Sequence, residues 1–467
     1  MVNPIPSIQA VREKKRPAVS GWILLAASIL LQLVLAFFFG HAYDTRINMA
    51  TGFLVGTGQN PYIAQNLSAV FHNNTFQGIT TVGYPPPWAL VMGLIYLCTF
   101  KILPDFLLYN LAIKLPIIAA NICLAYEVAY ILDKSGVQGR VSRKAWIFML
   151  FNPFLLLTSS AWGQFDPVVA LFALLSLFLL SEGGLTMPAI LLALAISLKP
   201  TALPLILVIF IYLAGRSLRR MVLFFAIFAS SMLMFCVAPF IILGWNPSQI
   251  LLHWNSQFVV GGGLSFMTFL EYVKWTYQLP GQWWFLGWLW LPALALAMLA
   301  LKPGIGEFED LLKKSVALIL VFFLCRAWLS ETNINLILPL VLILISLDAL
   351  DRRALAAVWV LPLIFSFFNT SLAQLFFPSM PGLMDKFLKW SAEFSTARYV
   401  LRTVDVAFWI FAGWWIVFRC IKRVAKSTGK GNSYGIVGRA RPAQQSHSFP
   451  DTMAIPYEPD GLRTSKR

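Results

Sequence analysis

Apolar stretches long enough to cross a bilayer as helices recur along this chain from Gly21 to Phe418. Only 12% of its 467 residues are charged, against about 25% in a soluble domain. The mean hydropathy is correspondingly high, at +0.73. Since a helix satisfies its own backbone polar groups within lipid, repeated stretches of about 20 apolar residues are typical of membrane-spanning helices. The sequence predicts an all-α polytopic membrane protein.

The first apolar stretch, GWILLAASILLQLVLAFFFG, follows the basic VREKKRP. This order resembles the charged region and apolar core of a signal peptide. The following HAYDTRIN is a poor cleavage site because it lacks the small-residue pattern. We therefore expect a retained first span.

The net charge of +16 is carried by basic residues between and beyond the apolar stretches. This distribution is typical of positive cytoplasmic loops, and it favours membrane lipid over nucleic acid as the partner. The cysteines show no paired spacing, which argues against a disulfide framework or a zinc site. They are Cys98, Cys123, Cys236, Cys325 and Cys420.

Charge parity constrains the topology of the first spans. The tail 1–21 and the loop 133–144 are both basic, so both are expected in the cytoplasm with an even number of crossings between them. Within that interval PPWALVMGLIYLCTF is too short for the ~20 residues a span needs. Segment 84–103 is therefore expected to form a re-entrant or interfacial helix on the outer side, and 106–132 is expected to be the second crossing.

The same parity applies to segment 188–214, which precedes the basic GRSLRR. It is expected to cross outward and return, with Lys199 and Pro200 at the outer tip, where proline ends the helix. In total we expect about twelve spans with both termini cytoplasmic. The other crossings are expected near 22–40, 145–161, 168–181, 221–242, 283–301, 315–329, 334–350, 354–372 and 404–419.

This topology divides the chain into a basic tail, a catalytic membrane module, C-terminal helices and a disordered basic cytoplasmic tail. Their expected bounds are 1–21, 22–350, 351–421 and 422–467, with long outer segments at 41–105, 243–282 and 373–403.

Polar residues that are unusual near a bilayer then gather on the outer face, at the ends of separate apolar stretches. Such residues are costly in a membrane and mark candidate functional sites. The candidate site residues are Asp44, Tyr84, Gln164, Asp166, Lys199, His253, Trp254, Arg326 and Glu331.

Several of these residues also have purely structural explanations. Asp44 could be a solvated flank of the first span. Asp166 could cap a helix that starts at Pro167. Lys199 could extend its amine along the helix to the interface.

The later candidates have structural alternatives too. Arg326 and Glu331 could form a structural ion pair. His253 could be an ordinary loop histidine, and Trp254 could belong to an interfacial aromatic belt.

The order of the motifs is more specific than any one residue. An Asp after the first span is followed by GQNPY, YPPP, GQFD, a Lys-Pro pair and the acid of SETN. This order resembles the GT-C superfamily of membrane glycosyltransferases. DTRINMATGFLVGTGQNPY with YPPPWALV looks most like glycosyltransferase family 87, the polyprenyl-phosphomannose and arabinofuranosyl transferases. The series is also similar to the dolichyl-phosphate-glucose glucosyltransferases. The resemblance covers roughly residues 22–345.

The resemblance implies a GT-C fold whose first outer loop carries interfacial helices and the catalytic acid, at Asp44. It implies an inverting transfer of a hexose, with mannose the first expectation, from a polyprenyl-phosphate sugar to a lipid-linked glycan or glycolipid. The expected location is the extracytoplasmic face of a prokaryotic plasma membrane.

Such a transfer needs a base for the acceptor hydroxyl and positive charge near the leaving phosphate. We assign the base to Asp44, which is ionised at neutral pH because a free carboxyl titrates near 4. Lys199 or Arg326 is expected to meet the phosphate. The helix that starts after Tyr84 would add its dipole.

The remaining candidates are expected to hold the substrates. Asp166 and Gln164 would orient sugar or acceptor hydroxyls. Glu331 would pair with a cation or bind the acceptor. His253 is a further substrate-binding candidate, and Trp254 would stack on a sugar.

No cofactor is expected. Two carboxylates could hold a divalent cation, but no DxD pair accompanies either acid, so metal-independent chemistry is favoured. The alternative function is a secondary transporter or lipid flippase, although internal repeats typical of transporters are not evident.

Overall fold

The structure is a computed structural model that describes residues 19–77, 83–248, 250, 262–269, 286, 288–301 and 307–427. The described residues up to Lys426 belong to one compact unit. The candidates His253 and Trp254, residues 1–18 of the predicted N-terminal tail, and residues 428–467 of the predicted C-terminal tail lie outside the described residues.

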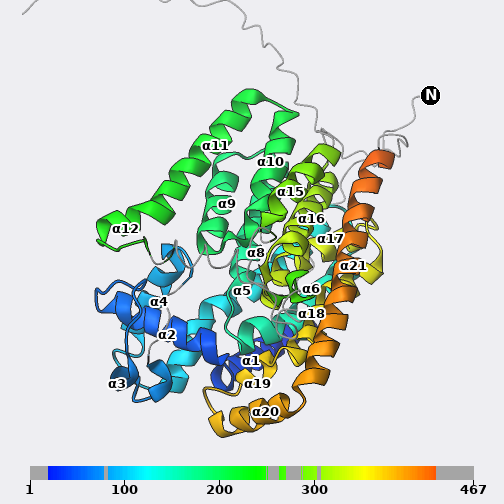
Figure 1. The fold of residues 1–467 in the computed structure, drawn as a ribbon. Helices are drawn as coiled ribbons and strands as arrows, with labels where there is room; N and C mark the ends of the chain where they lie inside the picture. Colours follow the sequence, from blue (N-terminus) through cyan, green and yellow to red (C-terminus); the bar gives the residue numbers. More distant parts are fainter. Residues whose placement is uncertain are drawn as a thin grey trace, which may run out of the picture. The chain divides into compact units, whose positions relative to one another are not determined.

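The described chain is almost entirely helical (Figure 1). The elements up to α8 are α1 (Val19–Phe38), α2 (Ala42–Gly56), α3 (Ser68–Phe71), η1 (Asn74–Phe76), α4 (Pro86–Cys98), α5 (Phe106–Lys134), α6 (Gly139–Phe151), α7 (Pro153–Leu156), η2 (Leu157–Ala161) and α8 (Asp166–Ser181).

The second part of the chain continues in the same way, with one short parallel strand pair. Its elements are α9 (Thr186–Leu198), η3 (Pro200–Ala202), α10 (Pro204–Ala214), α11 (Leu218–Met232), η4 (Leu233–Val237), α12 (Ala238–Ile242), β1 (Gly262–Gly263), α15 (Trp290–Ala300), α16 (Phe308–Cys325), β2 (Trp328–Leu329), η6 (Glu331–Leu336), α17 (Leu338–Ser346), α18 (Arg352–Phe368), α19 (Ser371–Gln374), α20 (Pro381–Glu393) and α21 (Ser395–Ser427).

The prediction of an all-α protein with membrane-spanning helices is confirmed. Among the described residues, four helices are long and apolar enough to span a bilayer. A fifth is added if the pair Gly139–Ala161 and Asp166–Ser181, bent by 117°, counts as one. The count of about twelve spans is not confirmed. The four are Gly21–Phe38, Phe106–Lys134, Leu218–Ile242 and Ser395–Ile421.

Several helices extend beyond the predicted spans, because a hydropathy pattern locates only the apolar part of a helix and not its polar ends. The last helix, predicted at 404–419, is α21 and begins at Ser395, inside the expected outer segment. The helix predicted at 315–329 is α16, which begins at Phe308 and carries its acidic residues in the first turn. The helix break at Pro200 is confirmed, since α9 ends at Leu198.

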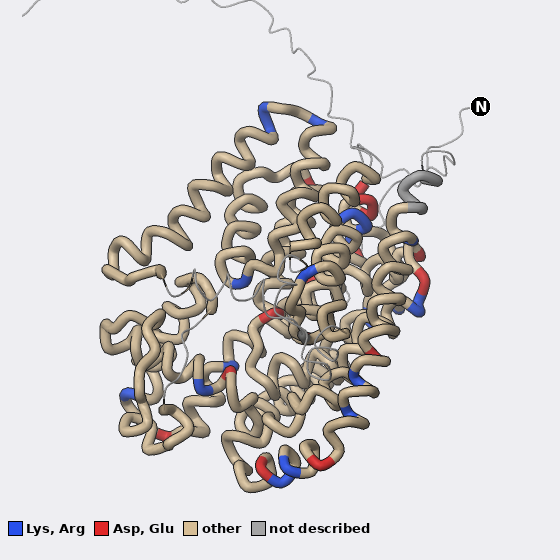
Figure 2. Tube along the Cα trace, viewed as in Figure 1, with Lys and Arg blue, Asp and Glu red and all other residues tan. Residues whose placement is uncertain are grey.

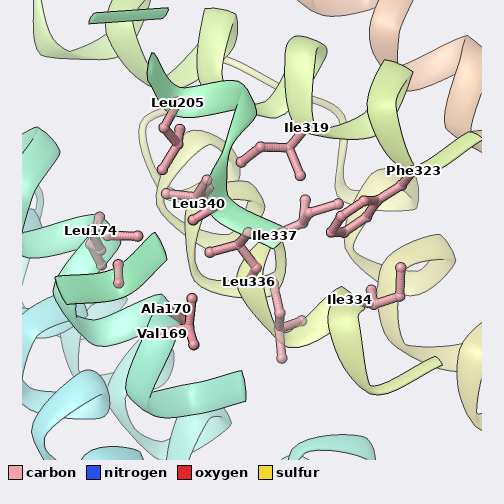
Figure 3. Close-up of a cluster of buried hydrophobic side chains, with 14 of the residues drawn as sticks. Val169, Ala170, Leu174, Leu205, Ile319, Phe323, Ile334, Leu336, Ile337 and Leu340 are labelled. Carbon is pink, nitrogen blue, oxygen red and sulfur yellow. The ribbon is translucent and has the colours of Figure 1, made fainter. Parts of the chain in front are cut away.

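Charged residues are sparse along the helices of the described chain (Figure 2). The core is correspondingly apolar, and the close-up in Figure 3 shows side chains of α8, α10, α16, η6 and α17 pointing toward one another. Close packing of this kind fixes the ends of the helices that contribute to it. The labelled core residues are Val169, Ala170, Leu174, Leu205, Ile319, Phe323, Ile334, Leu336, Ile337 and Leu340.

The strand pair holds the turn that follows α16. Gly262 and Gly263 pair in parallel with Trp328 and Leu329, and Ser265 Oγ donates to the carbonyl of Ala327. Gly263 has φ of 69°. A Cβ there would lie 2.0 Å from the carbonyl oxygen of Leu329, so only glycine allows this approach.

We predict that Gly263→Ala displaces the turn that carries Arg326 and lowers the melting temperature of the purified protein. The matched control is Gly58→Ala, at φ of 78° with no atom near the added Cβ, which adds backbone strain of about 1 kcal/mol and no clash. Thermal unfolding of both variants in the same detergent measures the difference. Equal losses would show that the backbone approach at Gly263 is not limiting.

Candidate functional site

The described residues enclose a cavity of about 370 Å³ where the ends of several helices meet. Its lining combines polar and apolar side chains. A pocket with few polar groups against an apolar wall is the usual form of a ligand site. The polar lining residues include Asp44, Asn48, Tyr84, Gln164, Lys199 and Arg326, and the apolar ones include Leu203, Met232, Cys236, Trp290 and Phe322.

The sequence candidates fall into three groups in space. Asp44, Tyr84, Gln164, Lys199 and Arg326 line the cavity. Asp166 lies beside it and is bonded to Lys199, a lining residue. Glu331 is buried away from the lining, although its neighbour Ser330 belongs to it.

Asp44 lies in the first turn of α2 and is held by two aromatic side chains. Trp162 Nε1 donates to Asp44 Oδ2 at 2.6 Å, and Nδ1 of His41 lies 3.1 Å from the same oxygen. The His41 ring stacks on Trp162 with centroids 4.2 Å apart. Both contacts fall on Oδ2, and a hydrogen bond with Gln164 also helps to hold the carboxylate.

These contacts determine the charge state of Asp44. Burial alone would raise the pKa of this carboxyl, but the His41 and Trp162 contacts outweigh burial and hold the pKa below its ordinary value. Asp44 is therefore an ionised carboxylate at neutral pH, and it is positioned by its neighbours instead of rotating in solvent. The explanation of Asp44 as a solvated helix flank is wrong.

Asp166 and Lys199 form a buried ion pair. Lys199 Nζ lies 2.7 Å from Asp166 Oδ2 and 3.2 Å from Gln164 Oε1, and both partners are almost fully buried. Asn333 Nδ2 donates to the other oxygen, Asp166 Oδ1, at 3.0 Å. The pair thus connects the start of α8, the end of α9 and η6.

This geometry corrects two structural explanations. Asp166 does not cap a helix from Pro167, because α8 already begins at Asp166 and its carboxylate is bonded to distant residues. Lys199 does not extend to the interface, because its amine is buried against Asp166. An amine committed to a carboxylate is also poorly placed to neutralise a phosphate.

Aromatic rings surround the Lys199 amine. Its Nζ lies 5.4 Å from the ring centroid of Tyr84 and 5.5 Å from that of Phe165, within the range of cation–π attraction. Phe165 stacks on Trp88 of α4 at 4.1 Å. Tyr84 therefore serves the site through its ring, and burial raises the pKa of its hydroxyl so that it stays protonated.

Arg326 is the cation of the cavity that has no acidic partner. The guanidinium lies 5.0 Å from the Phe322 ring centroid, and among the described residues it makes no ion pair or side-chain hydrogen bond. Arginine stays protonated in proteins and presents a fork of donors suited to phosphate or carboxylate. Arg326 is therefore the better of the two predicted anion-binding cations.

Glu331 does not pair with Arg326, contrary to the structural alternative. Its Oε1 accepts a hydrogen bond from Ser371 at 2.8 Å and a longer one from Ser366 at 3.5 Å. Both serines come from the C-terminal helices, α19 and α18. Burial raises the pKa of Glu331 above its ordinary value.

The backbone before Asp44 is fixed by residues from the same C-terminal region. Gly40 N donates to the carbonyl of Leu375 at 2.8 Å, and Ser379 Oγ donates to the carbonyl of Phe38 at 2.6 Å. From the other side, the buried Lys114 amine donates to carbonyls at the end of α1 and to that of Ala161 at 3.0 Å. These contacts fix His41 and Trp162 around Asp44.

Three residues of this arrangement were not anticipated from sequence. His41 stands three residues before Asp44, Trp162 stands in AWGQFD and Asn333 stands in SETN. A histidine one helical turn from a candidate acid was an available signal. Trp162 and Asn333 offered none, since their partners are far away in the chain.

The described residues include no group of three or more His, Cys, Asp or Glu side chains arranged to hold a metal ion. Asp166 already has partners on both oxygens. It would have to break its bond to Lys199 to share a cation with Asp44.

No protein-family model and no curated protein matches the chain. Among solved structures the chain is similar to ArnT from Cupriavidus metallidurans bound to undecaprenyl phosphate. The identity is 16% and the TM-score 0.44, over 86% of this chain and 77% of that chain.

We predict that Asp166→Asn destabilises the protein, because it leaves the Lys199 amine buried without a counter-charge. Breaking one partner of a buried pair costs about 3–5 kcal/mol. The double variant with Lys199→Met should recover much of that loss, which thermal unfolding of the full double-mutant cycle measures. The control is Glu182→Gln, since Glu182 pairs with Lys134 at 3.8 Å on the surface. A loss at Asp166 no larger than at Glu182 would contradict the assignment.

We also predict that Trp162→Phe raises the pKa of Asp44. The indole N–H stabilises the ionised carboxylate, so its removal favours the protonated form. A base must be ionised to act, so the acid limb of the pH–rate profile should move to higher pH by about one unit, as one hydrogen bond to a charged group implies.

The control for this variant is Trp146→Phe, because the Trp146 ring nitrogen is buried without a hydrogen-bond partner among the described residues. Its acid limb should stay in place. An unchanged limb in Trp162→Phe would show that the indole does not set the charge state of Asp44.

Proposed function

We propose that this protein is an extracytoplasmic, inverting glycosyltransferase of the GT-C type. In this proposal it moves a hexose from a polyprenyl-phosphate sugar to a lipid-linked glycan or glycolipid. The observation that carries the proposal is that one cavity holds both a fixed carboxylate, Asp44, and the guanidinium of Arg326, which has no ion-pair partner among the described residues. Mannose is the first sugar to test, and it rests on the sequence resemblance alone.

The cavity supports a lipid-phosphate donor in two ways. Its apolar wall includes Met232, Cys236 and Trp290 from α11, η4 and α15, which suits a prenyl chain arriving from the bilayer. Arg326 supplies a fork of donors for one phosphate. A nucleotide sugar would bring further charge and a polar base, which this wall does not match.

In the proposed reaction Asp44 removes the proton from an acceptor hydroxyl as its oxygen attacks the anomeric carbon of the sugar. The bond between that carbon and the phosphate oxygen breaks, and its electron pair leaves with the polyprenyl phosphate. A single displacement of this kind inverts the anomeric centre. The proton ends on Asp44, and Arg326 stabilises the charge that develops on the phosphate.

The remaining residues of the site have supporting roles in this proposal. Gln164, held by Lys199, presents an amide to sugar hydroxyls, and Asn48 is a further polar group of the lining. Asp166 positions Lys199 and Gln164 instead of contacting the sugar. Glu331 accepts a hydrogen bond from Ser371 and so connects η6 to α19.

The test uses the purified full-length protein in lipid nanodiscs, with synthetic polyprenyl-phosphate mannose or glucose as donor and extracted membrane lipids as acceptors. We predict release of polyprenyl phosphate and a glycosylated lipid product by mass spectrometry. GDP- and UDP-hexose should give none, and EDTA should leave turnover unchanged. Turnover with a nucleotide sugar alone would contradict the proposal, as would transport of the donor without a new glycosidic bond.

Two pairs of variants divide the roles in the same assay. Asp44→Asn should lower kcat about 10²–10⁴-fold, the contribution of a general base, and retain donor binding. Its control is Asp105→Asn, at an exposed helix cap that Asn also satisfies. Arg326→Met should raise the KM for the donor and lower kcat, while the exposed Lys101→Met should change neither. Full activity of Asp44→Asn would exclude it as the base.

A further inference from the structure

Helix α20 carries a stripe of large apolar side chains that the rest of the described chain leaves exposed. The α20 stripe consists of Leu383, Phe387, Trp390 and Phe394, which are 37%, 41%, 60% and 54% exposed. Their spacing of four, three and four residues places them on one side of the helix. No residue of α20 is fully buried.

The other sides of α20 differ in character. At about 100° per residue, the half-buried Met384, Leu388 and Ser391 lie on a second side, toward the protein. The charged residues lie on a third, and Figure 2 shows both signs of charge along this helix. They are Asp385, Lys386, Lys389 and Glu393. The α20 stripe thus lies between the packed side and the charged side.

The α20 stripe continues into the lipid-facing side of the next helix. Helix α21 is long and apolar enough to span a bilayer, and its exposed residues repeat at helical spacing. Leu401, Val404, Phe408 and Phe411 are 48%, 46%, 61% and 76% exposed. Phe394 stands at the junction, and Figure 1 shows α20 lying crosswise at the end of α21.

We propose that α20 is an interfacial helix whose stripe binds the surface of the lipid bilayer. A helix with Trp, Phe and Leu on an apolar side and charged residues on another lies in the plane of the interface, with its apolar side at the headgroup–acyl boundary. The spanning helix α21 places α20 at that depth. The partner is therefore the membrane that α21 already crosses.

This placement has a consequence for the site. Phe387 of the stripe stacks on Phe376 with centroids 5.6 Å apart, and Phe376 forms a bridge with Gly40, four residues before Asp44. Phe376 also contacts Phe39 edge-on at 5.6 Å. Bound to the interface, α20 fixes the segment that precedes Asp44 at the depth of lipid headgroups. The lipid contact itself does not depend on the proposed reaction.

The experiment measures the depth of each α20 position in a bilayer. Single cysteines at residues 383–394 are spin-labelled in full-length protein whose native cysteines are replaced, in nanodiscs of phosphatidylcholine and phosphatidylglycerol. Collisions with oxygen, which enters lipid, are compared with collisions with a water-soluble nickel chelate. Phe411 of α21 is the reference position for lipid, and the exposed Gln77 is the reference for water.

We expect oxygen to dominate at Leu383, Trp390 and Phe394, as at Phe411, and nickel to dominate at Asp385 and Lys389, as at Gln77. Nickel accessibility equal on both sides of α20 would overturn the proposal, since the stripe would then face water. Protection from both reagents would overturn it by showing a protein cover. Dipolar broadening between labels would also overturn it, because each protein carries one label and the broadening would show that the stripe contacts a second copy of the protein.

Discussion

The buried ion pair between Asp166 and Lys199 connects parts of the chain that the rest of the site depends on. Two charges inside an apolar protein are costly unless each satisfies the other and the remaining hydrogen bonds are made. Here Gln164 and Asn333 complete the set. Because the start of α8, the end of α9 and η6 all contribute to this set, its geometry fixes the positions of Lys199 and Gln164, which line the cavity. The ion pair therefore accounts for the presence of Asp166 and Lys199 between apolar segments, and neither residue needs a catalytic role to explain it.

With Lys199 neutralised by Asp166, the charges that remain for a ligand are Asp44 and Arg326. The first is a carboxylate kept ionised by His41 and Trp162, and the second is a guanidinium without a described partner. A base and an anion-binding group in one cavity with apolar lining residues match what the proposed transfer from a lipid phosphate requires. Lys199 and Arg326, the two cations predicted from the sequence to bind phosphate, are therefore not equivalent, because only Lys199 is neutralised by a carboxylate.

The C-terminal helices α18 to α20 contribute to the site through their contacts. Ser371 bonds Glu331, Leu375 receives the amide of Gly40, and Phe376 packs on Phe39. The segment between α18 and α21 thus holds the chain just before Asp44 in place. With α20 bound at the membrane surface, as proposed, these contacts also hold Asp44 at a constant depth relative to the bilayer. This depth suits substrates that diffuse in the plane of the bilayer.

Composition and motif order by themselves determined that the chain is an all-α membrane protein, that Pro200 breaks a helix, and which polar residues to examine. These follow from local rules: apolar length, charge and proline geometry act within a few residues. Only the tertiary structure decided which charges pair with which. Asp166 meets Lys199 across 33 positions, and Trp162 meets Asp44 across 118. Hydropathy carries no signal for such contacts, because the free energy of a buried charge depends on whichever distant partner the packing brings beside it.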